Sequence, residues 1–484
     1  MTILEQLRTK GVVATRLTAD SRRVQPGDVF VAFPGAHADG RDFIAQAVAR
    51  GATAVIAEEG RKLGAGDTAI VEVAGLAALS GEIAHLVYGR PSEHLWLAGI
   101  TGTNGKTSVS QWIAQAMNVM QHRCAVIGTL GNGFLDALDA SPNTTPDAIT
   151  LHAALAGFVA NGAEACAMEV SSIGLDQGRA NGAAFDVAVF TNLTRDHLEY
   201  HGTMAAYAAA KERLFFAPGL AAAVLNLDDP FGVELAKKLK GRPGDKIRTI
   251  GYTLGAADGS CVDEFLCAEH LAMDAAGIEF DLCGVQFAAP VVGRFNASNL
   301  LAVIGALLAR GERLEDIAPA MRAIRPPPGR MQALGGKDQP LVVVDYAHTP
   351  DALEKALGVL RETAAARGGR LACIFGCGGE RDPGKRPQMG AVAEALADRV
   401  VLTSDNPRGE DPYAIIDAIR GGMRRPPQVQ ADRARAIAEV IAVADAKDVV
   451  LLAGKGHEPY QEIAGVRLAF SDLDAAKSAL GARR

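Results

Sequence analysis

The 484-residue sequence has no apolar stretch long enough to cross a membrane. Its longest clean apolar run, residues 300–309, ends at Arg310 and is about half of the roughly 20 residues that a bilayer span needs, so we expect a buried helix there. The start of the chain places Glu5, Arg8 and Lys10 where a secretory signal peptide would need its apolar region. We therefore expect a cytoplasmic protein without a membrane span.

The sequence also lacks an excess of positive charge and a set of cysteines spaced for metal binding. The formal net charge is −7, and because affinity for a nucleic-acid backbone needs a broad basic surface, we expect no nucleic-acid partner. Small anionic ligands need only a local basic cluster and are not excluded. The seven cysteines are odd in number and lack paired metal-ligand spacing, which indicates reduced core thiols. They are Cys124, Cys166, Cys261, Cys267, Cys283, Cys373 and Cys377.

The length corresponds to about three domains at the usual ~150 residues each. Residues 88–92 (YGRPS) combine glycine and proline just before a new apolar strand, which places a first boundary after residue 90. The three consecutive prolines of residues 325–329 (RPPPG) cannot continue a helix or a central strand, which places a second boundary there. The expected domains are residues 1–90, 91–325 and 326–484, in a chain that we expect to be a monomer.

Short apolar segments alternate with helix-patterned segments in all three domains, a pattern typical of an α/β fold with largely parallel sheets. The expected strands are residues 28–33, 52–57, 95–100, 124–129, 165–170, 187–192, 222–226, 341–346, 371–376, 399–404 and 448–453. Most of the distinctive polar clusters come directly after one of these strands. Because ligands bind at this edge of an open parallel sheet, we expect the functional residues there.

A glycine-rich segment, TGTNGKTS at residues 101–108, lies between an apolar strand and an amphipathic helix, which is the context of a phosphate-binding loop. Its backbone N–H groups and the helix N-terminus would hold phosphates. Lys106 would neutralise charge on the β- and γ-phosphates, and the Thr107 hydroxyl would bind Mg²⁺. The strict pattern needs glycine at position 100, where this chain has Ile100. The loop alone leaves ATPase, kinase, GTPase switch and ligase open.

Further motifs lie on both sides of the phosphate loop in the sequence. They are AMEVSS (167–172), FTNLTRDHLEYHG (190–202), GRFNASN (293–299), VVVDYAHTPDAL (342–353), GCGGERDPGKRPQMG (376–390), SDNPRGEDP (404–412), AGKGHE (453–458), DSR (20–22) and ADGRDF (38–43). Together with the phosphate loop they cover essentially the whole chain, and this set resembles the Mur ligase family.

The resemblance implies an acid–amino-acid ligase of peptidoglycan precursor synthesis, with ATP as cosubstrate and Mg²⁺ as cofactor. It implies a UDP-sugar-binding N-terminal domain, a central P-loop ATPase domain and a Rossmann-like C-terminal domain that binds the amino acid. Among family members, the motifs match those that join meso-2,6-diaminopimelate to the D-glutamyl γ-carboxylate of UDP-N-acetylmuramoyl-L-Ala-D-Glu through an acyl phosphate. ATP would lie between the central and C-terminal domains, so we expect hinge closure near residues 325–329.

The resemblance also implies the catalytic and metal-binding residues. Lys106 is the catalytic lysine of the phosphate loop. Glu169 and His197 join Thr107 as ligands of divalent ions, and Lys211 becomes an anionic Mg²⁺ ligand once it is carbamylated. From the residues alone, Glu169 is also compatible with a helix N-terminal carboxylate, His197 with a packed loop histidine, and Lys211 with a surface lysine whose stem lies on apolar surface.

Three sets of substrate contacts follow from the matching positions. The ATP-binding residues are Gly102, Thr103, Asn104, Gly105, Lys106, Thr107, Ser108, Asn296, Asn299, Arg330, Asp345 and His348. The contacts to the UDP-muramoyl-dipeptide are Ser21 on the uridine side and Asn143, Thr144, Thr145, Ser171, Gln177 and Arg179 along the muramoyl-peptide. Without the resemblance, the two asparagines at 296 and 299 are equally compatible with helix capping. Many relatives carry histidine at the position of Ile173, so that histidine's role is not transferred.

The incoming amino acid has its own set of residues: Arg386, Asp405, Asn406, Pro407, Arg408, Gly454 and Glu458. Diaminopimelate carries a second carboxylate, which the guanidinium of Arg408 could bind in bidentate fashion. Alone, the DNPR segment is also compatible with a turn and a solvated arginine. Alternatives for the whole chain are the lysine-adding ligase of the same family, the folylpolyglutamate ligase type, and a non-catalytic nucleotide switch.

Overall fold

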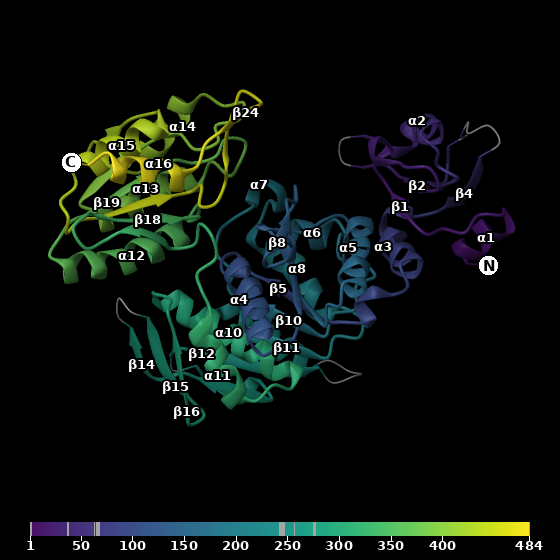
Figure 1. The fold of residues 1–484 in the computed structure, drawn as a ribbon, viewed down its shortest axis with the longest axis horizontal. Coiled ribbons are helices and arrows are strands. Elements are labelled where there is room, and N and C mark those ends of the chain that lie inside the picture. The colour runs from purple at the N-terminus through teal and green to yellow at the C-terminus, as the bar shows by residue number, and fades with distance from the viewer. Residues whose placement is uncertain are drawn as a thin grey trace.

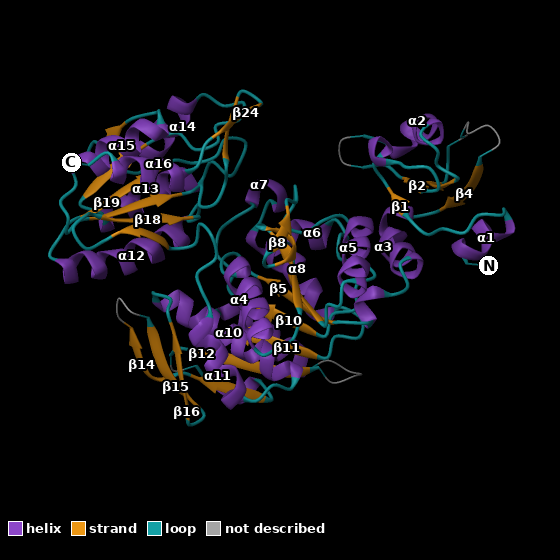
Figure 2. Cartoon of the chain, in the orientation of Figure 1, coloured by secondary structure: helices purple, strands orange, loops and turns teal. Residues whose placement is uncertain are grey.

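The computed structural model describes residues 2–35, 38–61, 63, 68–241, 247–255, 257–273 and 277–483. Figure 1 shows three bodies in chain order, an N-terminal unit in purple, a central unit in blue to green, and a C-terminal unit in green to yellow. In each of them the strands form a sheet with helices packed against it (Figure 2). The expected α/β fold is confirmed.

The N-terminal unit is built on a parallel four-stranded sheet in the order β1-β2-β3-β4. Its strands are β1 (Leu17–Thr18), β2 (Val29–Ala32), β3 (Ala54–Glu58) and β4 (Ala69–Val73), and its helices are α1 (Ile3–Thr9), α2 (Ile44–Ala49) and α3 (Leu76–Val87). The two strands expected here are β2 and β3. Helix α3 also packs on α5 (Ala148–Ala160) of the central unit, beside which it lies in Figure 1.

The central unit holds a nine-stranded sheet in the order β13-β12-β11-β10-β5-β9-β6-β7-β8. Its strands are β5 (Trp96–Thr101), β6 (Cys124–Gly128), β7 (Gly131–Phe134), β8 (Ala137–Asp139), β9 (Ala165–Glu169), β10 (Val187–Phe190), β11 (Ala222–Asn226), β12 (Arg248–Thr253) and β13 (Glu264–Cys267). All of its pairings are parallel except those of β7 with β6 and β8. A three-stranded antiparallel sheet of β14 (Glu269–Met273), β15 (Ile278–Leu282) and β16 (Val285–Ala289) follows.

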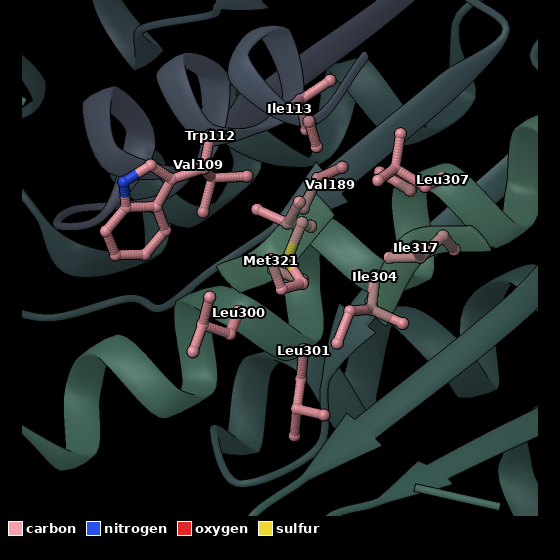
Figure 3. Packing of buried hydrophobic residues seen from close by; sticks show 14 of the residues in the cluster. Val109, Trp112, Ile113, Val189, Leu300, Leu301, Ile304, Leu307, Ile317 and Met321 are labelled. Carbon is pink, nitrogen blue, oxygen red and sulfur yellow. The ribbon is translucent and has the colours of Figure 1, made fainter. Parts of the chain in front are cut away.

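Helices cover both faces of the central sheet. They are α4 (Lys106–Val119), α5, α6 (Ser172–Asp176), α7 (Leu198–His201), α8 (Met204–Glu212), α9 (Pro230–Lys240), α10 (Arg294–Arg310) and α11 (Leu314–Ala323). Figure 3 shows the core on one face, where Trp112 and Ile113 of α4 lie near Leu300 and Ile304 of α10 and Met321 of α11. The apolar run at residues 300–309 is therefore confirmed as a buried helix segment.

The C-terminal unit has a six-stranded sheet in the order β17-β18-β22-β19-β20-β21, parallel except for the pairing of β17 with β18. Its strands are β17 (Gln332–Gly335), β18 (Leu341–Asp345), β19 (Leu371–Phe375), β20 (Arg399–Leu402), β21 (Gln428–Val429) and β22 (Val449–Ala453). Its helices are α12 (Pro350–Arg367), α13 (Lys385–Leu396), α14 (Pro412–Arg420), α15 (Arg433–Val443) and α16 (Asp472–Gly481). A hairpin of β23 (Tyr460–Ile463) and β24 (Val466–Ala469) stands beside this sheet.

Every strand expected from the sequence is present within a few residues of its expected bounds. The three prolines lie in the irregular segment between α11 and β17, so they interrupt regular structure as expected. No helix in the described part of the chain is long and apolar enough to cross a membrane. The boundaries after residue 90 and near residue 325 stay predictions.

One expectation about the cysteines is wrong in part. All seven are free, but only Cys124, Cys166, Cys373 and Cys377 are buried. Cys261 and Cys267 are half-buried and Cys283 is exposed, because these three lie in the short edge and turn segments after β12 rather than in central strands.

Candidate active site

The phosphate loop connects β5 to α4 as the sequence predicts. Gly105 has a φ of 87°, and a Cβ there would lie 2.5 Å from Oδ1 of Asn299, so the amide of Asn299 on α10 lies closer to the loop than a side chain at position 105 would allow. The Lys106 ammonium donates to the carbonyl oxygens of Gly102 (2.8 Å) and Thr103 (2.9 Å). Burial lowers its pKa, which the nearby carboxylates of the site oppose. The loop therefore carries a half-buried ammonium group close to its own carbonyl oxygens.

Lys211 lies directly beneath this loop. Its side chain is 1% exposed, so the alternative of a surface lysine is wrong. Its Nζ donates to Gly102 O (2.9 Å), the carbonyl that Lys106 also uses, and lies 4.4 Å from the centre of the Tyr207 ring. Burial and the charge of Lys106 hold the pKa of Lys211 well below its usual value.

Glu169 ends β9 and faces the strand-end loop after β6. It accepts hydrogen bonds from the backbone N–H (2.9 Å) and the hydroxyl (3.0 Å) of Thr129. The helix that follows begins at Ser172 with Ser171 as its N-cap, so the alternative of a helix N-terminal carboxylate is wrong. Thr107, at the start of α4, accepts a hydrogen bond from the Arg330 guanidinium of the C-terminal unit (3.1 Å).

Most of the residues expected to contact the muramoyl-peptide form one connected group. Thr145 donates to the carbonyl of Glu169 (3.0 Å) and accepts from the backbone N–H of Ser171 (2.9 Å). Arg179 donates to the carbonyl of Thr145 (3.0 Å) and to Oε1 of Gln177 (2.7 and 3.0 Å). This polar group therefore leads away from Glu169 towards α6.

Three expected contacts to the nucleotide sugar lie at the edge of that group or apart from it. Thr144 reaches it through the hydroxyl of Thr129 (3.1 Å). Asn143 is exposed. Ser21 lies in the N-terminal unit, where its hydroxyl donates to Gln46 (2.7 Å).

Asn296 and Asn299 lie inside α10, whose N-cap is Gly293, so the capping alternative is wrong. Both are buried. Asn296 donates to Val292 O (2.8 Å), and Asn299 donates to Oδ1 of Asn296 (3.3 Å). Because Asn299 also lies against Gly105, these two amides border the phosphate loop.

The C-terminal unit adds the end of β18 to this region. Asp345 accepts from the backbone N–H groups of Met331 (2.7 Å) and Ala347 (2.8 Å), and burial raises its pKa. The Arg330 guanidinium lies 4.6 Å from the centre of the Tyr346 ring. The carboxylate thus fixes the loop that carries Arg330, and this loop reaches Thr107 across the interdomain boundary.

His197 and His348 meet at a carboxylate that the sequence analysis missed. Asp196 is buried, and its oxygens lie 3.5 Å from His197 Nε2, 3.7 Å from His348 Nε2 and 3.7 Å from the Lys385 ammonium. Burial opposes its ionisation, but the neighbouring side chains of His348, His197 and Lys385 hold the pKa of Asp196 well below its usual value. His197 itself has a φ of 53°, at the N-terminus of α7.

A second interdomain ion pair lies next to this cluster. Arg195 donates to both oxygens of Asp382 (3.0 and 3.2 Å). The signal for both contacts was present in the sequence, since RDH and DPGK each follow an expected strand. The sequence does not show which residues pair, because the partners lie almost 190 residues apart.

The residues expected to bind the amino acid gather at the ends of β20 and β22. Asn406 donates from Nδ2 to Glu458 Oε2 (2.7 Å). Asp405 is buried, and Gly454, with a φ of 110°, leaves it room, because a Cβ there would lie 2.6 Å from Asp405 Oδ2. Burial raises the pKa of Asp405. A buried lysine that the sequence analysis missed, Lys455, lies among these groups.

The two expected arginines lie on the other side of this group. Arg408 has a φ of 51°, pairs its backbone with Glu462 and Ala464 of the hairpin, and donates from its guanidinium to Gly379 O (2.7 Å). It is half-buried, so the alternative of a solvated arginine is wrong. Arg386 is buried and donates to Gly378 O (3.4 Å) and Glu410 (2.9 Å). Both guanidinium groups therefore border the loop after β19.

The donor chemistry near the phosphate loop fits Mg²⁺. Thr107 offers a hydroxyl and Glu169 a carboxylate, and hard oxygen donors of this kind are the ones that Mg²⁺ takes. Among the described residues no three or more His, Cys, Asp or Glu side chains gather as a metal site. Mg²⁺ sites commonly use one or two carboxylates together with water and substrate phosphates, so this sparse set is compatible with the ion.

Comparison with known proteins agrees with this arrangement. Three family models match in chain order: the Mur ligase family, catalytic domain at residues 13–88, the Mur ligase middle domain at residues 100–307, and the Mur ligase, glutamate ligase domain at residues 329–456. The UDP-N-acetylmuramoyl-L-alanyl-D-glutamate--2,6-diaminopimelate ligase of Ectopseudomonas mendocina is 53% identical, over 98% of this chain and 96% of the relative. The chain belongs to the Mur ligase family.

Two further relatives are similar over nearly the whole chain. The protein of the same name from Pseudomonas aeruginosa is 52% identical, over 98% of this chain and 96% of its own length. A solved structure of a protein with this name has a TM-score of 0.67 and 39% identity, and the match covers 97% of this chain and 95% of that one. The resemblance, the three-domain α/β architecture and the assignment to a family of ligases are thereby confirmed.

Proposed function

We propose that this Mur ligase joins meso-2,6-diaminopimelate to the D-glutamyl γ-carboxylate of UDP-N-acetylmuramoyl-L-Ala-D-Glu, with cleavage of ATP to ADP and phosphate. The observation that carries the proposal is the group of charged residues beside the hairpin. Asp405 and Glu458 supply carboxylates there, and the guanidinium of Arg408 lies at the loop after β19. The ligand would present ammonium and carboxylate groups at both of its ends, so it needs both kinds of partner.

ATP is proposed to bind where the phosphate loop faces the C-terminal domain. Backbone N–H groups from Gly102 to Ser108 would surround the phosphates, and Lys106 would exchange its present carbonyl partners for phosphate oxygens. Asn296 and Asn299 border the loop on one side. Arg330, Asp345 and His348 supply the C-terminal side of the site, which agrees with the contact of Arg330 to Thr107.

The proposed chemistry has two steps. In the first, an oxygen of the D-glutamyl γ-carboxylate attacks the γ-phosphorus, the bond to the β-phosphate oxygen breaks, and ADP leaves. In the second, the amine of diaminopimelate attacks the acyl carbon, the bond to the phosphate oxygen breaks, phosphate leaves, and the amine loses a proton. Positioning and charge neutralisation are the main contributions of a protein to such phosphoryl transfer, and Lys106 supplies a charge.

Mg²⁺ would be held by Thr107 and Glu169, with His197 and carbamylated Lys211 as ligands of a second ion. It would neutralise charge on the phosphates. The burial of Lys211 and its lack of a carboxylate partner among the described contacts support carbamylation, because a carbamate would place a negative charge beside Lys106. The reaction adds CO₂ to the neutral amine and releases one proton.

The remaining assignments stay proposals. The N-terminal domain would bind the uridine side of the substrate through Ser21, and the group from Asn143 to Arg179 would bind the muramoyl-peptide. The protein would act in the cytoplasm as a monomer, and closure of the C-terminal domain would pivot near residues 325–329. The contacts of Arg195 with Asp382 and of Asp196 with His348 are among those that such a movement would change.

The lysine-adding ligase is the nearest alternative, since it would share the ATP and nucleotide-sugar sites. Arg408 disfavours it, because lysine has no second carboxylate for this guanidinium. A non-catalytic nucleotide switch leaves the amino-acid residues without a purpose.

Product analysis tests the proposal. The protein is incubated with ATP, Mg²⁺, diaminopimelate and a nucleotide substrate labelled with ¹⁸O in the D-glutamyl γ-carboxylate, and the products are identified by mass. The proposal requires the amide product together with ¹⁸O in the released phosphate. Amide product without label in phosphate would rule out the acyl phosphate, and absence of product would rule out the ligation itself.

A further inference from the structure

Lys455 is buried among three residues of the proposed amino-acid site. Its side chain is completely inaccessible to solvent, yet it ends in a charged group. The ammonium lies 3.0 Å from Glu458 Oε2, 3.1 Å from Asn406 Oδ1 and 3.7 Å from Asp405 Oδ1. A lysine is seldom buried in this way unless its charge is paired.

The contact with Lys455 fixes the orientation of Asn406. An ammonium can only donate hydrogen bonds, so the atom that faces it must be the amide oxygen. The backbone N–H of Glu462 donates to the same oxygen (3.0 Å), which fixes the same orientation independently. The amide nitrogen then points to Glu458 Oε2 (2.7 Å). Lys455 and Asn406 thus hold one oxygen of Glu458 between them and leave the other for a further donor.

Charge also favours a cationic group at this place. The carboxylates of Asp405 and Glu458 and the ammonium of Lys455 together carry one net negative charge. The neighbouring pair of Arg433 and Asp472 is buried and neutral, with Arg433 donating to both oxygens of Asp472 (2.7 and 2.6 Å). An incoming ammonium would therefore meet one uncompensated negative charge, held in place by Lys455.

We propose that Lys455 is a positioning residue for the third amino acid: it sets the orientation of Asn406 and Glu458, so that these side chains receive an ammonium group of the incoming amino acid. The inference rests on the proposed function and adds a residue to it. Lys455 acts through its neighbours, since its side chain is completely buried and its ammonium donates to Asn406 and Glu458. This role of Lys455 is separate from the proposed binding of the second carboxylate by Arg408.

The test replaces Lys455 by methionine, which keeps the length of the side chain and removes the charge. Lys477→Met is the matched control, because Lys477 is exposed on α16 in the same domain. Kinetic constants for all three substrates are measured on the full chain with the other two saturating. We expect Lys455→Met to raise the KM for diaminopimelate roughly tenfold or more, because hydrogen bonds to charged groups are lost. The KM values for ATP and the nucleotide sugar should stay within about twofold of wild type.

A pH profile adds a readout that a purely structural role would not change. Burial raises the pKa of Asp405, and Arg433 and Lys455 oppose that rise, whereas Glu458 and Asp472 add to it. Without Lys455 the pKa of Asp405 rises further. The acid limb of kcat/KM for diaminopimelate should therefore move to higher pH in Lys455→Met and stay in place in Lys477→Met.

Each outcome has a definite meaning. If wild type uses diaminopimelate, two results for Lys455→Met overturn the proposal: an unchanged KM for diaminopimelate, or an equal change in all three KM values. If wild type itself does not use diaminopimelate, the proposed function fails, and the inference fails with it. Lys455→Gln, which keeps a donor for Asn406, is measured in parallel and should show a smaller rise in KM. Failure of both variants to fold assigns Lys455 to stability alone and overturns the proposal.

Discussion

Gly105→Ala should damage the use of ATP much more than it damages the fold. At a φ of 87°, a residue with a Cβ is strained by about 1–2 kcal/mol. The new Cβ would also lie 2.5 Å from Asn299 Oδ1, closer than side-chain atoms approach, so the Asn299 amide must move away from the phosphate loop, or the loop itself must shift. A misplacement of about 1 Å at a positioning group can lower a rate on the order of 100-fold. We expect kcat/KM for ATP to fall by roughly 10- to 100-fold.

Gly311→Ala provides the matched control. Gly311 follows α10 with a φ of 104°, and a Cβ there would have no neighbour within 4 Å. Both variants share the backbone strain, and only Gly105→Ala adds the contact with Asn299. Each should therefore lower the free energy of unfolding by about 1–2 kcal/mol in urea titration, and only Gly105→Ala should lower kcat/KM for ATP. Wild-type kcat/KM for ATP in Gly105→Ala would refute the assignment of this loop to phosphate binding.

Three further predictions concern ionisable side chains. Lys106→Met should lower kcat on the order of 100-fold or more, measured as phosphate release at saturating substrates, since it removes a charge from the proposed phosphate site; a kcat near wild type would contradict that role. Asp472→Asn should lower the free energy of unfolding by about 3–5 kcal/mol in urea titration, because Arg433 loses its buried partner. The double variant Arg433→Met/Asp472→Leu should recover most of the lost stability, because it leaves no buried charge unpaired. Burial lowers the pKa of His152 to about 4 from its usual 6.5. Between these two pH values the unfolded chain therefore binds more protons than the folded protein. As the pH falls from 6.5 to 4, His152 should lower the free energy of unfolding by about 1.4 kcal/mol per pH unit. His152→Gln should reduce that slope in unfolding experiments across this range, and an unchanged slope would contradict the prediction.

The central strands of the sheets could be predicted from the sequence, and the edge strands could not. Buried parallel strands such as β9 and β22 are continuous apolar runs, because both of their faces are covered. The antiparallel strands β14 and β24 are largely exposed and β23 is half-buried, so no such run marks them. The hairpin of β23 and β24 is therefore missing from the sequence analysis, although it pairs with the backbone of Arg408.

Within the site, residues with a local motif were found and their long-range partners were not. Lys106 belongs to a glycine-rich loop between an expected strand and an expected helix, and this local context indicates phosphate binding. Asp196 and Lys455 each lie beside an identified residue in the sequence, but their importance depends on side chains that folding brings together, such as Lys385 and Asn406. The burial of Lys211 was not evident from its helical neighbours either, because the phosphate loop that covers it lies more than 100 residues earlier.

The most direct test of the central claim is the amino-acid dependence of phosphate release. Release from ATP is measured with UDP-N-acetylmuramoyl-L-Ala-D-Glu present, and meso-diaminopimelate, L-lysine and no amino acid are compared. The account predicts strong stimulation by diaminopimelate and little by lysine, because only diaminopimelate offers a second carboxylate to Arg408. Stimulation by lysine alone would contradict the assigned specificity, and release that no amino acid stimulates would contradict the ligase itself.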